Sequence, residues 1–469
     1  MRRRVRSIFR TCVLLLLAVP AQAQNESKLA ADFRGEGERF QKSCEELSLS
    51  SVLSCAELLF TDHPLHIAVG SIAPENGFGA GAAFVTHYTP NDSWRLSWDT
   101  DAIGSSNGSW RAGVYMKAIY TGTKKITEEK GRPKKPSEPN QAILKRPYFN
   151  FYTQAISLNK LDYFGLGPGS LESNRTFFGM REIIPGGNAI VPVPQSNWLN
   201  LSLYGELNGR VVDIRNSSGQ PSPSIGRIFT EATAPGLTAQ PGFVQFGEGI
   251  QLQPSYGNHV RLNYQVSFQQ FVAASDSHFS FRRFTTDFEH DFPLYKTTRS
   301  LAPKIHNGPD DCSVGVDNHS CPAITRDLEG SVSLRLLISE SIAPAGHTVP
   351  FYFQPTLGGG DLDGTTSLAS YQDYRFRAPN LMLLRGTFEH TIYGPLGFSF
   401  GYDEGKAALT RNAIDFAHLV HSFSTGLTLR AGGFPQVFLL FAWGGHEGTH
   451  TIALMNPSLL GGSARPSLY

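Results

Sequence analysis

The segment His446-Glu447-Gly-Thr-His450 has the H-E-x-x-H pattern, which is the strongest chemical motif in this sequence. In zinc peptidases the pattern lies on a helix, where two histidines one turn apart bind one metal ion and the glutamate acts as a base. Here Gly444, Gly445 and Gly448 disfavour a helix. In an extended chain the two histidines would lie about 13 Å apart. The sequence therefore predicts the penultimate turn of the sheet, with no metal or other cofactor.

A serine hydrolase is the second chemical possibility. No G-x-S-x-G elbow stands near a plausible base, and no phosphate-binding loop occurs. A lipase or acyltransferase would need only a serine and a histidine at a strand end, and His290, His418 and His421 are candidates for the histidine. Lone histidines on strands are more often interfacial. We expect no enzyme activity, with a lipase or acyltransferase as the alternative.

The first 23 residues have the features of a cleaved secretory signal peptide. Five arginines precede the short apolar core Cys12–Val19, and Ala21-Gln-Ala23 gives a cleavage site. The core is shorter than the roughly 20 residues of a membrane-spanning helix, which leaves a membrane anchor as the weaker alternative. Cleavage removes five of the 41 basic residues and none of the 40 acidic ones, so the mature net charge is −4. That charge argues against nucleic-acid binding.

Four cysteines remain after cleavage, an even number in an oxidising compartment. Three pairings are possible, and proximity favours Cys44 with Cys55 and Cys312 with Cys321. Neither pair has the spacing of a metal site. We expect two disulfides that staple loops.

Strand-like alternation of apolar and polar residues recurs along the mature chain. In Val260–Gln269 each apolar residue is followed by a polar one, so one face of a strand would be apolar and the other polar. The same pattern recurs in 94–99, 199–208, 283–292 and 331–339. The segments run to about ten residues, as tilted membrane strands do, and aromatic residues stand at many strand ends.

These features predict an all-β fold, a transmembrane antiparallel β-barrel of about 16 strands in the outer membrane. A closed barrel satisfies every backbone hydrogen bond within the bilayer without apolar helices. A soluble β-sandwich or propeller is the alternative, because soluble sheets also alternate. We expect residues 24–62 to form a partly helical periplasmic lead-in or plug and residues 63–469 to form the barrel.

Unequal connections predict the orientation of the barrel. Short turns such as Tyr393-Gly-Pro395 should be periplasmic, whereas long polar links should be extracellular or folded into the lumen. The long links are 124–145, 216–241, 296–326 and 358–372. Basic residues in the first link indicate a solvated loop, and a specific anionic partner is the alternative reading.

Several motifs, in order, resemble the BamA/TamA-like outer-membrane proteins, also called the bacterial surface antigen family. They are Tyr163-Phe-Gly-Leu-Gly167, Arg175–Phe178, Pro355-Thr-Leu-Gly-Gly359, Tyr374–Arg377, Leu383–Glu389, Gly394–Gly397 and Phe400–Gly405. The residues that carry the resemblance include Tyr163, Gly165, Gly167, Gly358, Gly359, Tyr371 and Gly405. The resemblance covers about residues 64–460 and is specific only around 160–180 and 355–405.

The resemblance implies a loop latch inside the barrel. In the family, an arginine at the tip of the sixth extracellular loop contacts a strand glutamate and a strand aspartate, which match Glu389 and Asp403 here. In this chain Ala369 stands at the arginine position. We therefore expect Arg375 or Arg377 to supply the cation, because a guanidinium binds carboxylates strongly and directionally. In the alternative, both carboxylates simply line a wet lumen.

The resemblance also implies a function, in which the barrel assists insertion or transport of protein or lipid through a weak seam between its first and last strands. Pro457 should shorten the last strand, since proline cannot donate to a ladder. The expected partners are outer-membrane lipid and envelope protein or lipid clients. The alternatives are a passive pore and a surface-display barrel presenting the 296–326 link.

Overall fold

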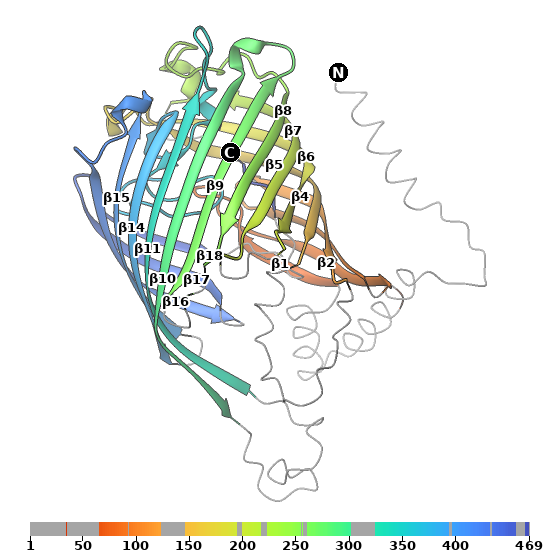
Figure 1. Ribbon diagram of the computed structural model, residues 1–469. Coiled ribbons are helices and arrows are strands. Elements are labelled where there is room, and N and C mark those ends of the chain that lie inside the picture. The colour runs from red at the N-terminus through yellow and green to blue at the C-terminus, as the bar shows by residue number, and fades with distance from the viewer. Residues whose placement is uncertain are drawn as a thin grey trace, which may run out of the picture. The chain divides into compact units, whose positions relative to one another are not determined.

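Sixteen strands form one antiparallel barrel sheet in the computed structural model, and each strand lies beside the next in chain order (Figure 1). The structure describes residues 34, 65–91, 93–122, 146–194, 199–216, 223–254, 256, 260–301, 324–393, 396–431, 434–455 and 465–468. The barrel strands are β1 (Leu65–Ser71), β2 (Phe78–Asn91), β3 (Trp94–Ser105), β4 (Trp110–Tyr120), β5 (Tyr148–Tyr163), β6 (Thr176–Pro192), β7 (Ser202–Asn216), β8 (Phe243–Leu252), β9 (Arg261–Ala273), β10 (Phe281–Leu301), β11 (Ile324–Ile342), β14 (Asn380–Tyr393), β15 (Leu396–Ala408), β16 (Val420–Ala431), β17 (Phe434–Gly445) and β18 (Gly448–Met455). The prediction of about 16 strands is confirmed.

The barrel wall is apolar outside and polar inside. Along β7, Leu203, Leu207 and Val211 are each about half exposed, whereas Asn208 and Arg210 on the opposite face are fully buried. Because strand side chains alternate between faces, the leucines point away from the barrel and the polar residues point into it. This is the alternation that the sequence predicted, and it is what a lipid-facing barrel wall requires.

The connections alternate between the two barrel ends because consecutive strands are antiparallel. We call the end where β1 begins the proximal end and the other the distal end. The links 216–241 and 358–372 leave from the distal end, whereas 124–145 and 296–326 leave from the proximal end together with the 393–395 turn. The 124–145 and 296–326 links leave from the same end as the 393–395 turn. The prediction that these two links are extracellular while the turn is periplasmic was therefore wrong. Strand order, and not link length, decides the end from which a link leaves.

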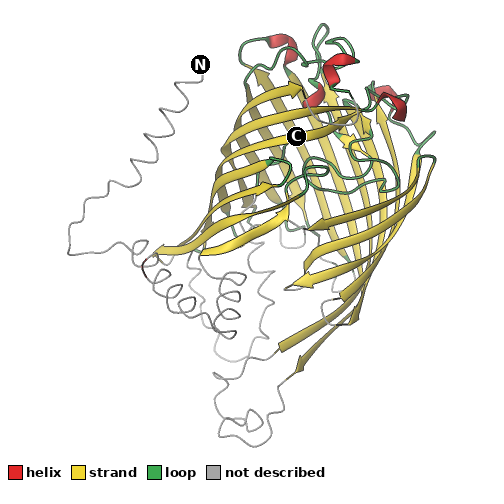
Figure 2. Ribbon diagram, turned by 180° about the vertical axis from the view of Figure 1, so that it is seen from behind, coloured by secondary structure: helices red, strands yellow, loops and turns green. Residues whose placement is uncertain are grey.

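The β11–β14 loop (residues 343–379) is the longest described connection. It contains the 3-10 turn η4 (Phe351–Phe353) and a separate two-stranded sheet of β12 (Thr356–Leu357) and β13 (Phe376–Arg377). The other 3-10 turns are η1 (Glu172–Asn174), η2 (Ile225–Arg227), η3 (Ser277–Phe279) and η5 (Arg411–Ala413). All five follow strands that end distally, and Figure 2 shows the helical turns gathered at one end of the barrel.

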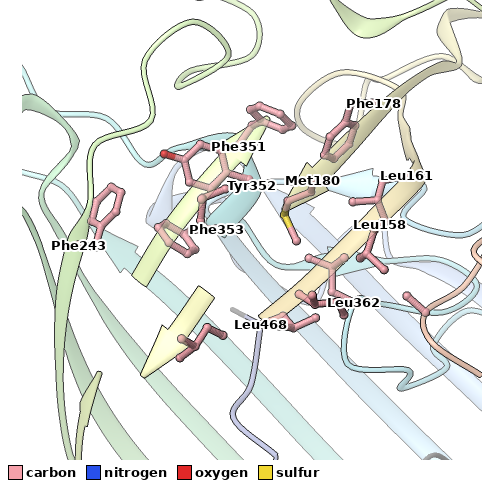
Figure 3. Packing of buried hydrophobic residues seen from close by; sticks show 14 of the residues in the cluster. Leu158, Leu161, Phe178, Met180, Phe243, Phe351, Tyr352, Phe353, Leu362 and Leu468 are labelled. Atoms are coloured by element: carbon pink, nitrogen blue, oxygen red, sulfur yellow. The ribbon is translucent and has the colours of Figure 1, made fainter. Parts of the chain in front are cut away.

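An aromatic cluster anchors this loop to the barrel wall (Figure 3). The Phe351 ring meets Tyr163 edge to face at 5.2 Å between centroids and Phe178 at 5.1 Å. The Phe353 ring meets Phe243 in the same way at 5.0 Å. Edge-to-face pairs of this kind add about 1 kcal/mol each to the burial of the rings. The loop is therefore held at its start by β5, β6 and β8.

Several expectations lie outside the described residues. The signal peptide, the lead-in apart from Arg34, and all four mature cysteines are among them. The chain divides into two units, residues 1–66 and residues 67–469. No helix among the described residues is long and apolar enough to span a membrane.

Candidate functional site

The middle of the β11–β14 loop lies inside the barrel, beside a cavity of about 880 Å³. The loop contributes Leu362–Thr366 and Ala369 to the lining of this cavity. The interior faces of β14 and β15 contribute Arg385, Glu389 and Asp403. The two carboxylates that the family resemblance singles out therefore face one interior space together with the loop.

Asp403 binds the tip of the loop. Its Oδ2 accepts a hydrogen bond from the Leu368 backbone N–H at 2.8 Å, and its Oδ1 accepts one from Arg385 Nε at 2.8 Å. Arg385 also donates to the Thr366 carbonyl, so it holds the loop and the strand carboxylate at once. Beyond the tip, the Ser370 N–H donates to Ser422 Oγ at 2.9 Å. A latch on Asp403 therefore exists, and a strand arginine supplies its cation.

The expectation that Arg375 or Arg377 supplies that cation is corrected by these contacts. Arg375 forms an ion pair with Glu447 and donates to Ser170 Oγ at 2.8 Å. Arg377 donates to the Phe351 carbonyl at 2.8 Å, within its own loop. The physical reason is the β12–β13 ribbon, which places Arg375 beside Ser170 and Glu447 and places Arg377 beside the Phe351 carbonyl.

The H-E-x-x-H motif forms a strand turn. His446 and Glu447 are the two residues between β17 and β18, which makes this the last turn of the barrel, and Gly448 has φ +100°. His450 lies in β18, opposite Ala442. The chain is extended after this turn, which is the last turn and not the predicted penultimate one, and the Glu447 carboxylate is bound by Arg375. Among the described residues no group of three His, Cys, Asp or Glu side chains could hold a metal ion.

The motif at the end of β5 meets the same loop. Tyr163 is fully buried and donates its hydroxyl to the Thr233 carbonyl at 2.5 Å. Gly165 and Gly167 have φ of +105° and +80°, which glycine adopts without strain. The Gly167 N–H donates to the Arg377 carbonyl at 2.7 Å. The two regions that resemble the family, far apart in sequence, are therefore in direct contact.

At two further motif positions, Gly359 in the loop and Gly405 in β15, neighbouring atoms lie too close for a larger side chain. A Cβ on Gly359, whose φ is +57°, would lie 2.7 Å from Asp373 Cα. One on Gly405 in β15 would lie 2.9 Å from Leu357 Cδ1. Tyr371 fills the adjacent space, and its hydroxyl lies 3.2 Å from His446 Nδ1. These residues make the loop fit closely against β15 and the β17–β18 turn.

Burial changes the protonation of the loop. It raises the pKa of Asp373 to about 6, and it also raises the pKa of Asp361, where repulsion from Asp363 adds to the shift. Both carboxyl groups of the loop therefore bind a proton more readily than an aspartate in water.

The first and last strands of the sheet meet at a seam. β1 and β18 stand at opposite ends of the strand order, and among the described residues no ladder joins them. The end of β18 reaches the end of β1 through a hydrogen bond from the Met455 N–H to Ser71 Oγ at 3.2 Å. Ser71, Leu454 and Met455 also line the interior cavity. The seam between β1 and β18 therefore borders the cavity that holds the loop.

The chain is similar to solved structures of CdiB and BamA. CdiB from Acinetobacter baumannii is 12% identical with a TM-score of 0.44, over 83% of this chain and 58% of CdiB. CdiB from Escherichia coli is 11% identical with a TM-score of 0.45, over 84% and 60%. BamA from Haemophilus ducreyi lacking POTRA domains 1-3 is 11% identical with a TM-score of 0.42, over 89% and 80%.

These likenesses concern the barrel fold alone. This chain spans about three-fifths of the length of either CdiB structure. No family model and no curated protein matches the sequence.

Arg385 is the site residue that sequence reasoning missed. It stands in the same strand motif as Glu389, four positions earlier, so both side chains point to the same face. In the β14–β15 ladder it lies directly opposite Asp403. The parity of the strand could have placed Arg385 in the lumen, but only the register places it against Asp403.

We expect Asp403→Asn to weaken the latch without abolishing the barrel. The change removes the charge that binds Arg385, and Arg385 is partly exposed to the cavity, so a loss of about 2 kcal/mol in the free energy of unfolding is expected. Urea unfolding in detergent, together with proteolysis of the loop, measures it. Asp291→Asn is the control, because its ion pair with Arg261 is exposed and should contribute about 0.5 kcal/mol or less. Equal losses for the two variants would contradict the latch.

Proposed function

We propose that this chain is an outer-membrane β-barrel that assists the transport or insertion of protein or lipid at that membrane, without enzymatic chemistry. The observation that carries the proposal is that β1 and β18 stand at opposite ends of the described strand order and meet beside an interior cavity. Strand edges can expose N–H and C=O groups that pair with another chain. Opening of this seam would give a client a route from the lumen into the bilayer.

The orientation of the barrel supports this proposal. An exported chain reaches the membrane from the periplasm, and β1 begins at the proximal end, so the proximal end faces the periplasm. The β11–β14 loop then enters the lumen from the outside. The 296–326 link leaves from the periplasmic end in this orientation, which argues against its display on the cell surface.

The filled lumen argues against the passive-pore alternative. The β11–β14 loop is tied to the wall through Asp403, Ser422 and Glu447, and residues 465–468 line the same cavity. A steady, wide pore needs an unobstructed passage. We therefore expect the intact chain to conduct little when reconstituted alone.

Locking the seam tests the proposal. In Ser71→Cys/Met455→Cys a disulfide would join the ends of β1 and β18, which already touch. We expect the oxidised variant to change the outer membrane as loss of the protein does, with depletion of particular barrels or lipids, and a reducing agent to restore it. Quantitative protein and lipid composition of the membrane is the measurement.

A matched pair on neighbouring strands provides the control. Ser424→Cys/Ala442→Cys would join β16 to β17, which already form a continuous ladder. This disulfide should leave membrane composition unchanged. An envelope that is also unchanged by the locked seam, and by loss of the protein, would overturn the proposed function.

A further inference from the structure

Residues 465–468 lie inside the barrel and contact three separate parts of it. Arg465 forms an ion pair with Asp101 of β3. The Ser467 carbonyl accepts a hydrogen bond from Arg210 of β7 at 2.7 Å. Ser467 and Leu468 both donate to Asp363 of the β11–β14 loop. The segment therefore bridges the loop and the barrel wall.

The barrel binds both a backbone N–H and a backbone carbonyl of the segment. Asp363 Oδ1 accepts the Leu468 N–H at 2.8 Å, while Arg210 binds the Ser467 carbonyl. Arg210 is 1% exposed and is held in place by Glu182, whose Oε1 lies 2.9 Å from Arg210 NH1. Backbone groups are common to all peptides, so these contacts recognise a peptide as such.

Side-chain contacts make the recognition selective. Ser467 Oγ donates to Asp363 Oδ2 at 2.6 Å, so one carboxylate binds a hydroxyl and an adjacent N–H. The Arg465 guanidinium pairs with Asp101, which is 2% exposed, and lies 5.8 Å from the centroid of the Tyr115 ring. Leu468 is buried in the apolar cluster that also contains Leu362 (Figure 3). A basic, a hydroxyl and an apolar residue each have a matching partner.

We propose that residues 465–468 occupy a peptide-binding site in the lumen, and that the site also accepts, in trans, a peptide with a basic residue, a hydroxyl residue and an apolar residue in this order. The segment is then an internal ligand that narrows the lumen. Releasing it would enlarge the cavity beside the seam, because Arg465–Leu468 form part of its lining. It would also remove one attachment of the β11–β14 loop, at Asp363.

Shortening the chain tests the site directly. A chain ending at Ala464, folded as judged by heat-dependent migration in gel electrophoresis, should bind a fluorescent peptide of residues 465–469 with a dissociation constant on the order of 1 mM. In planar bilayers it should conduct several-fold more than the intact chain, and the peptide should reverse this increase. A peptide with Arg465→Glu and Ser467→Ala should do neither.

A single substitution in the intact chain provides a second test. Asp363→Ala removes both acceptors for Ser467 and Leu468, and should raise conductance towards that of the shortened chain. The control is Asp415→Ala, because Asp415 is exposed and binds Lys406 and the Ala417 N–H at the distal end. Absence of peptide binding, or equal conductance of the folded shortened chain and the intact chain, would overturn the proposal. Peptide binding and conductance are measured without a client. A negative result would therefore overturn the peptide site and leave the proposed function untouched.

Discussion

Glu447→Leu is expected to destabilise the barrel by about 3–5 kcal/mol, because it leaves a buried guanidinium without its counter-ion. Arg375 and Glu447 are each 3% exposed, and Arg375 lies over the ring of Phe376 at 4.8 Å. The pair joins the β11–β14 loop to the turn before β18, which is one edge of the seam. Its loss should lower the urea midpoint and expose the loop to proteolysis.

Two further variants separate the ion pair from general damage. Arg375→Met with Glu447→Leu removes both charges, and it should recover most of the lost stability because no unpaired charge remains. Glu340→Leu breaks the ion pair with Arg411, which is 53% exposed, and it should cost about 1 kcal/mol or less. A double variant no more stable than Glu447→Leu alone would contradict the buried-pair account.

Gly358→Ala should have the second large effect, a loss of about 3 kcal/mol or more. Gly358 has φ +103°, and a Cβ there would lie 2.5 Å from Arg375 Cβ and 2.9 Å from the Gln372 carbonyl oxygen. Backbone strain contributes about 1–2 kcal/mol and the steric conflict a similar amount. The β12–β13 ribbon would have to open, which should shift Arg375 away from Glu447. Denaturant unfolding and loop proteolysis measure the result.

Gly364→Ala is the matched control for this effect. Gly364 has φ +81° in the same loop, but no atom lies within 4 Å of its added Cβ. It should show only the backbone strain, about 1–2 kcal/mol. Equal losses at the two glycines would show that the close approach of the loop segments does not contribute.

The wall of the barrel could be predicted from the sequence because its cause is local. A strand that faces lipid on one side and a polar lumen on the other must alternate with period two, and Val260–Gln269 shows that period directly. Gly165 and Gly167 were identified through the family resemblance, and both adopt the left-handed backbone conformation that glycine tolerates without strain. Each of these signals lies within a few residues of its structural consequence.

The candidate site could be predicted only in part, because its partners are remote in sequence. Asp403 was identified through its motif, but its cation is Arg385, which the β14–β15 register places opposite it. From the sequence, Arg375 was expected to bind Glu389 and Asp403. In the structure the β12–β13 ribbon places Arg375 against Glu447 instead. The prediction from link length also put the 124–145 and 296–326 links at the wrong end of the barrel, because the strand order determines the end from which each link leaves.

By itself the sequence predicted an exported chain with an alternating wall of about 16 strands and a motif-bearing loop. The tertiary structure alone decided which charges meet inside the lumen, that β1 and β18 stand at the two ends of the described strand order, and that residues 465–468 bind Asp101, Arg210 and Asp363. The physical reason is the range of the interactions. Alternation and turn chemistry act between neighbours in the chain, whereas lumenal ion pairs join residues up to hundreds of positions apart and depend on how the barrel sheet brings its strands together.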